Sequence, residues 1–406
     1  MSGASTPGND MAADESGWHV LALNSGSSSL KFGLYRVAAA RIDTLLSGEA
    51  ESIGGSDGRF RAYDSRRREL VSETVVIPGQ REALVRIRKL LHESGMPAPV
   101  AVGHRIVHGG PSLRQHCLID DSVLAKLEAA TAFAPLHTPA TLSVIRFALA
   151  NFPGVPQAAC FDTNFHAGLP DVARVLPIPL ELRSQGIERY GFHGLSIESV
   201  LHALGSERPR RIVVAHLGNG SSVTAVEAGK SIDTSMGLTP AGGLMMGTRS
   251  GDLDPGILVY LMREKQLDAS ALDDLVNRQS GLLGVSGIGS DMRHLHEAAC
   301  SNADARLAIQ MFCYRARKEI AAMIAVLGGV DLIVFTGGIG EHDAEVRAEI
   351  CVGLSWVGVS LDAERNRSGT NPVHDAASRC AVQVLTSQED EQIARHTRAL
   401  LAGRRS

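Results

Sequence analysis

The sequence has 406 residues, of which 44% are hydrophobic and 21% charged, and its formal net charge is −4 at pH 7. This length allows two domains of ordinary size, and the hydrophobic content is typical of globular chains that bury a core. The small negative charge excludes a global basic field for nucleic acid or anionic lipid, and no apolar run approaches the roughly 18 residues of a membrane helix. We therefore expect neither a nucleic-acid nor a membrane partner.

The cysteines, the N-terminal residues and one basic cluster give three further expectations. The six cysteines are scattered without a CxxC pair, which predicts reduced thiols rather than disulfides or a zinc site. Residues 1–17 lack the basic start and apolar core of a signal peptide, so we expect a disordered tail on a cytoplasmic protein. The one basic cluster, residues 59–68, is short and contains acidic residues, which predicts a solvated turn.

Two distant segments share a pattern of an apolar run, a turn rich in glycine and serine, and a second apolar run. Residues 20–23 and 30–37 flank the turn at 24–29, and residues 212–217 and 223–226 flank the turn at 218–222. Each pattern predicts a β-hairpin. Either turn alone is more often an ordinary β-turn than a phosphate site. A third apolar run, 332–335, leads into another glycine-rich turn at 336–341, and this recurrence favours two related lobes whose turns face phosphate.

Residues 81–92, 307–327 and 389–401 carry apolar side chains at helical spacing. Because such a helix is followed closely by the apolar run at 332–335, the connections predict crossovers and thus α/β lobes.

Several glycine-flanked segments contain polar residues that a plain core would not hold. They are Gly103-His-Arg-Ile-Val-His-Gly-Gly110, Ala134-Pro-Leu-His-Thr-Pro139, Cys160-Phe-Asp-Thr-Asn-Phe-His166, Tyr190-Gly-Phe-His-Gly194, Ala215-His-Leu-Gly-Asn-Gly220 and Met246-Gly-Thr-Arg-Ser-Gly-Asp252. In this order they closely resemble the acetate kinase family, over about residues 20–397.

The resemblance implies an α/β fold of the sugar-kinase, actin and Hsp70 type, with two duplicated lobes and the active site in the cleft between them. The N-terminal lobe, 18–165 with 386–406, would carry the acceptor and metal, and the C-terminal lobe, 166–385, would bind the nucleotide. The implied activity is reversible phosphorylation of acetate by ATP with Mg²⁺, and the implied assembly is a homodimer.

The chemistry of such a reaction asks for positive charge rather than a base. Acetate is already ionised at pH 7, so its difficulty is to approach a polyanionic triphosphate. Arg105 and Arg249 are candidates, because a guanidinium is always charged and binds carboxylate or phosphate bidentately. The resemblance implies that Arg105 binds the acetate carboxylate, that Arg249 helps to hold acetate and the transferring group, and that His193 donates to the phosphoryl oxygens.

The resemblance also implies a supporting role for His137 and a catalytic role for Asp162. The family's aspartate is often called a proton acceptor, but we expect it to organise magnesium or tune the arginines. The implied methyl pocket consists of Val107, Leu136, Phe192 and Pro240. His104, His108, His116 and His166 are left unassigned.

The remaining implied residues bind the nucleotide and the metal. The nucleotide residues are Lys31, His216, Leu217, Gly218, Asn219, Gly220, Asp291, Met292, Arg293, Gly338, Ile339, Gly340, Glu341 and His342. The metal residues are Asn24 and Glu389. Two segments depart from the family pattern: its Thr-Asn-Glu-Glu stands here as Ser387-Gln-Glu-Asp390, and its Leu-His-Asn-Pro as Leu136-His-Thr-Pro139.

Two alternatives stay open. The preferred acceptor could be propionate or butyrate, since one methylene in an apolar pocket discriminates by only about 1–3 kcal/mol, and propionate is expected as a secondary substrate in any case. The chain could instead be an ATP-driven binding or chaperone module, which needs nucleotide turns but no carboxylate clamp. Arg105, Arg249 and His193 in matching segments argue against the second alternative.

Overall fold

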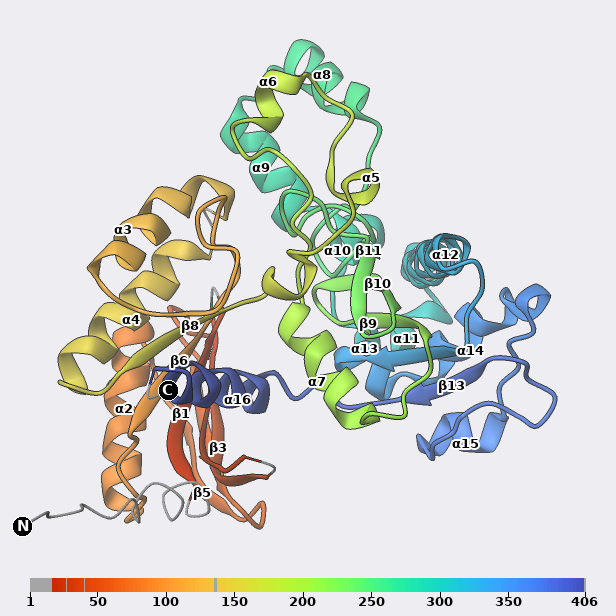
Figure 1. Cartoon of the computed structure of the whole chain (residues 1–406). Coiled ribbons are helices and arrows are strands. Elements are labelled where there is room, and N and C mark those ends of the chain that lie inside the picture. The colour runs from red at the N-terminus through yellow and green to blue at the C-terminus, as the bar shows by residue number, and fades with distance from the viewer. Residues whose placement is uncertain (1–16, 27, 40, 135–136, 405–406) are drawn as a thin grey trace, which may run out of the picture. The chain divides into compact units, whose positions relative to one another are not determined.

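The computed structural model describes residues 17–26, 28–39, 41–134 and 137–404 (Figure 1). The chain divides into two compact units: unit 1 takes the chain up to Asn164 and again from Gln388, and unit 2 is Phe165–Ser387. The tail expected at 1–17 lies outside the described residues except for Gly17, and Leu136 lies outside them as well.

Unit 1 is built on an eight-stranded sheet with the order β5-β4-β3-β2-β1-β6-β8-β7. The strands are β1 (Trp18–Ser25), β2 (Leu30–Val37), β3 (Ile42–Glu51), β4 (Arg59–Asp64), β5 (Glu69–Thr74), β6 (Ala101–Ile106), β7 (Cys117–Leu118) and β8 (Gln157–Phe161). Strands β1 to β5 form an antiparallel meander, and β1, β6 and β8 run parallel. The first predicted hairpin is therefore confirmed as β1 and β2.

The basic segment at 59–68 is not merely a solvated turn, as its charge had suggested. It contains strand β4, in which Phe60 and Ala62 are buried while Arg59 is exposed. This alternation is the period of a half-buried strand, and the local charge concealed it.

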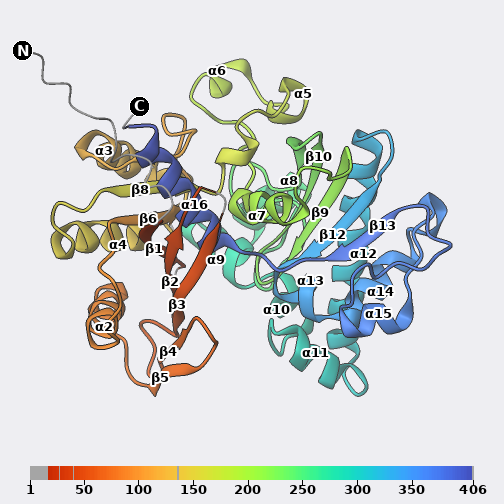
Figure 2. The same cartoon turned by 60° about the horizontal axis from the view of Figure 1, so that its bottom comes forward.

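Helices cover both faces of the unit 1 sheet (Figure 2). Helices α2 (Gln80–Glu93) and α4 (Thr138–Asn151) pack on the face that includes Val102, whereas α16 (Glu389–Ala402) packs on the opposite face. Gly103 permits the close approach of α16, because a Cβ there would lie 2.3 Å from Thr397 Oγ1. Helix α3 (Asp121–Ala129) and the short η1 (Ala130–Phe133) precede α4.

Unit 2 repeats the central topology of unit 1. Its sheet has the order β11-β10-β9-β12-β13, from β9 (Arg211–Leu217), β10 (Ser221–Glu227), β11 (Lys230–Thr234), β12 (Leu332–Thr336) and β13 (Ala381–Val384). Strands β9, β10 and β11 are antiparallel, and β9, β12 and β13 are parallel. This matches β3-β2-β1-β6-β8 strand for strand, which confirms the second hairpin and the duplicated lobes.

The two faces of the unit 2 sheet pack against α12 (Ala303–Val326) and α7 (Gly194–Leu204). The segment after β12, expected as a turn, is a short helix, α13 (Gly337–His342), because the Glu341 carboxylate accepts from the N–H of Gly337 and closes its first turn. The other helices of unit 2 are η2 (Asn164–His166, at its boundary), α5 (Asp171–Arg174), α6 (Leu180–Arg183), α8 (Pro255–Glu264), α9 (Ala269–Arg278), α10 (Gly281–Ser286), α11 (Met292–Ala299), α14 (Ala344–Val352), η3 (Ser355–Val357) and α15 (Ala363–Ser368).

Among the residues that the structure describes, no helix combines the length and the apolar character needed to cross a membrane.

Candidate active site

Three polar residues in unit 1 lie where neighbouring parallel strands end. Asn24 is near the end of β1, Arg105 near the end of β6, and Asp162 directly follows β8. The carboxyl ends of parallel strands share one edge of a sheet, which is where α/β folds present ligand-binding residues. Arg105 Nε lies 3.0 Å from each oxygen of Asp162, and its Nη2 lies 2.7 Å from Oδ2.

The pair between Arg105 and Asp162 is well removed from solvent. The Asp162 side chain is 1% exposed and that of Arg105 is 18% exposed. Burial alone would lower the pKa of the Arg105 guanidinium, but the carboxylates of Asp162 and Glu389 outweigh it and raise that pKa above its usual value. Arg105 is therefore a permanent, oriented positive charge.

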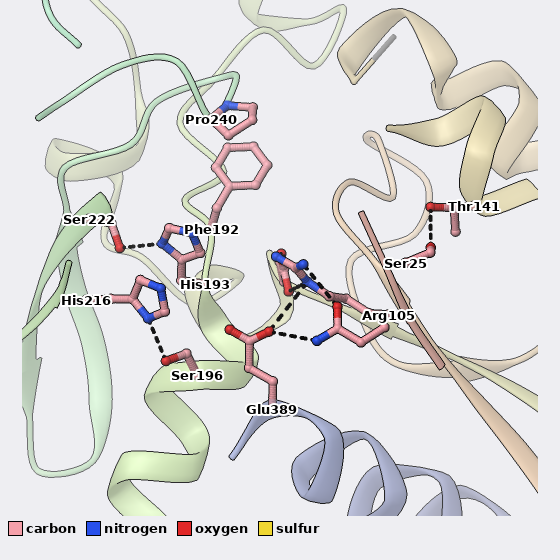
Figure 3. Close-up of polar contacts among 12 residues, drawn as sticks. Ser25, Arg105, Thr141, Phe192, His193, Ser196, His216, Ser222, Pro240 and Glu389 are labelled. Carbon is pink, nitrogen blue, oxygen red and sulfur yellow. Dashed lines mark hydrogen bonds and ion pairs between the residues drawn. The ribbon is translucent and has the colours of Figure 1, made fainter. Parts of the chain in front are cut away.

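Helix α16 brings two acids to the same place, Glu389, which is labelled in Figure 3, and Asp390. Asn24 Nδ2 donates to Glu389 Oε2 at 3.1 Å and to Asp390 Oδ1 at 3.0 Å, while Arg105 Nη1 donates to Asn24 Oδ1 at 3.1 Å. Arg105 Nε is 3.9 Å from Glu389 Oε2. The Asn24 amide thus links the cationic residue to the acids at the start of α16.

Asp390 is a member of this cluster that the sequence reasoning missed. Burial raises the pKa of its carboxyl to about 6, the hydrogen bond from Asn24 lowers it, and the charge of Glu389 raises it. The available signal was the departure from the family pattern, which keeps an acid directly after Glu389.

The oxygen donors here suit a hard divalent cation. Mg²⁺ takes one or two protein carboxylates together with phosphate oxygens and water, and Glu389 and Asp390 offer two carboxylates side by side. Asn24 turns its amide nitrogen to both acids and its oxygen to Arg105, so its shown role is to hold the acids.

In unit 2, two histidines lie against each other at the start of α7 (Figure 3). His193 and His216 stack with ring centroids 4.1 Å apart. His193 Nδ1 is 3.0 Å from Ser222 Oγ, and His216 Nδ1 is 2.8 Å from Ser196 Oγ. Because Ser222 and His216 are a cross-strand pair of β10 and β9, the hairpin itself sets this arrangement.

The turn between β9 and β10 lies beside both predicted transfer residues of unit 2. A Cβ at Gly220 would be 3.3 Å from His193 Nε2 and 3.5 Å from Arg249 Nη1, which also donates to the Pro240 carbonyl at 3.0 Å. A Cβ at Gly247 would be 2.0 Å from Asn219 Oδ1, so this segment lies close against the turn and a side chain there would displace that of Asn219. His193, Arg249 and the turn therefore lie together, as predicted for a phosphate-facing site.

A pocket of about 1530 Å³ opens next to this turn. Its lining includes the predicted nucleotide residues Gly218, Asn219, Asp291, Met292, Arg293, Gly338, Ile339 and His342. Segments from β9, α11 and α13 thus converge on one hollow, which has ample room for a nucleotide.

Other predicted nucleotide residues lie outside this lining. Leu217 is buried in the core of unit 2, and the Gly340 carbonyl accepts from Arg347 Nη1 at 2.9 Å. Glu341 Oε1 accepts from the N–H of Gly337 and of Ser387, each at 3.0 Å, so its carboxylate holds the start of α13. Lys31 is exposed on β2 in unit 1, paired with Asn24 in register. Their roles toward a nucleotide stay predictions.

The predicted acceptor residues come from both units. Val107 is buried in unit 1 and lines a small void of about 10 Å³, and His137 is partly buried at the start of α4. Phe192 is buried and Pro240 is partly buried, both in unit 2. The methyl pocket stays a prediction.

Comparison with known proteins gives consistent matches over nearly the whole chain. The sequence model described as the acetokinase family matches residues 19–395. The acetate kinase of Heliobacterium modesticaldum is 41% identical, with 95% of this chain and 100% of that protein covered, and the one of Campylobacter jejuni is 41% identical, with 94% and 99% covered.

Solved structures are similar over the same span. A propionate kinase from Francisella tularensis has a TM-score of 0.87 at 37% identity, covering 94% of this chain and 100% of its own. The acetate kinase of Porphyromonas gingivalis has a TM-score of 0.83 at 36% identity, covering 95% and 100%. This similarity confirms the predicted fold type.

Proposed function

Because this chain belongs to the acetokinase family, we propose that it transfers the γ-phosphoryl group of ATP reversibly to acetate, giving acetyl phosphate and ADP, with propionate as a secondary substrate. One of the similar solved structures is described as a propionate kinase, which agrees with a permissive acceptor pocket. ATP as the phosphoryl donor is consistent with a cytoplasmic location.

The observation that carries the proposal is the fixed charge of Arg105. Both oxygens of Asp162 and the oxygen of Asn24 accept from its guanidinium, which sets its plane. A planar guanidinium held in this way binds a carboxylate with defined geometry. Since acetate has no proton to lose at neutral pH, Asp162 acts by positioning Arg105 and not as a base.

The unit 2 residues supply the other half of the reaction. The adenosine would occupy the large pocket, and the phosphates would face the turn at Gly218 to Gly220. There, His193 Nε2 and Arg249 would donate to oxygens of the transferring group, whose charge spreads in the transition state.

Glu389 and Asp390 would hold Mg²⁺, with Asn24 fixing both acids. When bound, the ion would neutralise phosphate charge. Glu389 also lies beside Arg105, so the guanidinium balances part of the charge of the acids and a bound cation would balance more of it.

An acyl-hydroxamate assay tests the function directly. Wild-type protein with ATP and Mg²⁺ should convert acetate fastest, propionate more slowly and butyrate least. Arg105→Ala should raise the KM for acetate by at least about tenfold, because charge-assisted hydrogen bonds are among the stronger polar contacts. ATP turnover without acyl product would instead favour the binding-module alternative, and wild-type acetate kinetics in Arg105→Ala would contradict the acceptor assignment.

The proposed homodimer has support in helix α8. No residue of α8 is buried, even though the helix is rich in apolar side chains. Its residues Ile257, Val259, Tyr260 and Met262 are between 42% and 56% exposed. A helix rich in exposed apolar side chains is typical of an association surface, and a second copy of the chain is the partner we propose. Light scattering should give twice the mass of one chain, and Val259→Asp should shift it toward the monomer. A monomeric wild type would contradict this assembly.

A further inference from the structure

His166 contacts the segment that carries His193, although no role has been assigned to it above. Its ring is 1% exposed, with Nδ1 2.8 Å from Ser231 Oγ and Nε2 3.0 Å from the Phe192 carbonyl oxygen. A carbonyl only accepts, so Nε2 carries a hydrogen. Burial lowers the pKa of the ring to about 4, partly offset by the hydrogen bond to Phe192, so the ring is neutral near pH 7. Nδ1 therefore accepts from the Ser231 hydroxyl.

The segment that His166 contacts has an unusual backbone. His193 has φ 59° and ψ 21°, in the left-handed region that costs a non-glycine residue about 1–3 kcal/mol. Two residues earlier, Gly191 has φ 71°, and a Cβ there would lie 2.7 Å from the Cγ of His166. Only glycine thus fits between the His166 ring and the chain.

Hydrogen bonds hold this strained backbone on both sides of Phe192. The N–H groups of Tyr190 and Gly191 both donate to the Gly237 carbonyl, at 3.0 and 3.4 Å. On the other side, the Phe192 carbonyl accepts from His166. The peptide that this carbonyl belongs to is the one that leads directly into His193, so its orientation sets the φ of His193.

We propose that His166 is a positioning residue: by holding the Phe192 carbonyl it keeps His193 in its left-handed conformation and aims the imidazole toward the transferring phosphoryl group. The inference rests on the proposed function of His193. A residue in a sparsely populated conformation persists only when its surroundings over-determine it, and the hydrogen bond from His166 is a direct restraint on this peptide. His166 itself is buried, and each of its ring nitrogens is within hydrogen-bond distance of a protein group.

Replacing His166 tests the role. His166→Phe keeps a ring but removes both nitrogens, so the Phe192 peptide can relax and His193 loses its aim. We expect kcat to fall about 10–100-fold while KM for ATP and acetate changes less than about threefold, because interactions made only in the transition state lower kcat. The amide of His166→Gln can still donate to the carbonyl, so this variant should keep much of the wild-type kcat. Ser231→Ala removes the hydroxyl that bonds Nδ1 and should lower kcat by less than His166→Phe does.

A control variant separates an effect on the position of His193 from an effect on the stability of the fold. Val334→Ala truncates a fully buried side chain of β12 in the same unit, and should lower the melting temperature while leaving kcat unchanged. Wild-type kcat in a folded His166→Phe, or an equal loss of kcat in Val334→Ala, would overturn the proposal. If His166→Phe does not fold, His166→Gln and Ser231→Ala decide the question by the same split of kcat and KM.

One readout does not depend on the reaction. ¹⁵N chemical shifts of the wild-type His166 ring should show a neutral imidazole protonated at Nε2, and the opposite tautomer would remove the hydrogen bond on which the inference rests. Absence of any wild-type transfer to acetate would contradict the proposed function, whereas the ring shifts would still report on His166.

Discussion

A single amide organises the polar cluster of unit 1. Asn24 uses its oxygen for Arg105 and its nitrogen for Glu389 and Asp390, so one neutral side chain joins the guanidinium to both acids. Such a network in a partly buried place is strong only while each member is satisfied. The residue between the charges is therefore as consequential as the charges themselves.

Glu389 can be tested against a purely structural role. If it holds Mg²⁺, Glu389→Gln removes an anionic ligand, and the Mg²⁺ concentration for half-maximal activity should rise several-fold, with excess Mg²⁺ restoring part of the activity. Glu391→Gln is the matched control, since Glu391 is also an acid in the first turn of α16 but pairs with Arg395.

The alternative is that Glu389 only favours the helix dipole, worth typically about 0.3–1 kcal/mol. Both variants would then lower the melting temperature slightly and leave the Mg²⁺ titration unchanged. That outcome would exclude Glu389 as a metal ligand.

His104 gives a prediction about pH. Its buried ring lies 2.7 Å from Gln157 Oε1, and burial lowers its pKa to about 4, partly offset by that hydrogen bond. The unfolded chain binds a proton below the ordinary pKa of about 6.5, whereas the folded chain does not until pH 4. The stabilising contribution is thus present above pH 6.5 and lost as the pH falls toward 4.

Removing this group should weaken the dependence of the melting temperature on pH below pH 7. His104→Gln should lower the melting temperature at pH 7.5 but show a smaller further drop between pH 7 and pH 4.5 than the wild type. Melting curves across that range measure the difference in slope, and parallel slopes would mean that His104 titrates normally in the folded protein.

At the scale of elements, the predictable features are those with a strong local period. Hairpins β1–β2 and β9–β10 and helices α2, α12 and α16 follow from apolar spacing and glycine. Strand β4 was missed because charge masked its alternation, and α13 because glycines disguised a helix start that Glu341 closes. Local sequence does not encode that closing contact.

The site shows the same division. Arg105, Asp162 and His193 stand in distinctive motifs, so the resemblance predicts them. Asp390 joins the site only because α16 packs against strands far away in the chain, as in the contact of Asn24 with Asp390 across 366 positions.

Helix α16 depends on the absence of a side chain at Gly103. Gly103→Ala would place a Cβ 2.3 Å from Thr397 Oγ1 and 2.6 Å from Ile393 Cγ2, so the helix must shift. Overpacking of this kind typically costs about 1–3 kcal/mol. We expect a lower melting temperature together with a higher Mg²⁺ requirement, because Glu389 moves with the helix.

A compensating change sharpens this test. Thr397→Ala removes the nearest atom, a hydroxyl that donates to the carbonyl of Ile393 in the same helix at 2.8 Å, and should restore part of both properties in the double variant. Gly168→Ala, where a Cβ would meet no atom within 4 Å, should be close to neutral. Equal effects of Gly103→Ala and Gly168→Ala would contradict the close packing of α16.

At the scale of the whole molecule, one topology has been put to two uses. In unit 1 the ends of β1, β6 and β8 carry an amide and two charged groups, whereas in unit 2 the corresponding ends of β9 and β12 carry glycine segments and open onto a large pocket. A small charged acceptor needs fixed charge, and a nucleotide needs room and close backbone approach, so the duplicated sheet edge suits both.

This division predicts that the two binding functions separate by mutation. Arg105 belongs to unit 1, and Ile339 lines the pocket of unit 2. Arg105→Ala should raise the KM for acetate while the Kd for ATP, measured by calorimetry without acetate, stays within about twofold. Ile339→Ala removes an apolar contact and should raise the KM for ATP several-fold without changing the KM for acetate. In the double variant the free-energy effects on kcat/KM should add within about 0.3–0.5 kcal/mol, as for independent sites. A larger departure from additivity would mean that Arg105 and the nucleotide pocket act as one coupled site, contrary to the assignment of one substrate to each unit.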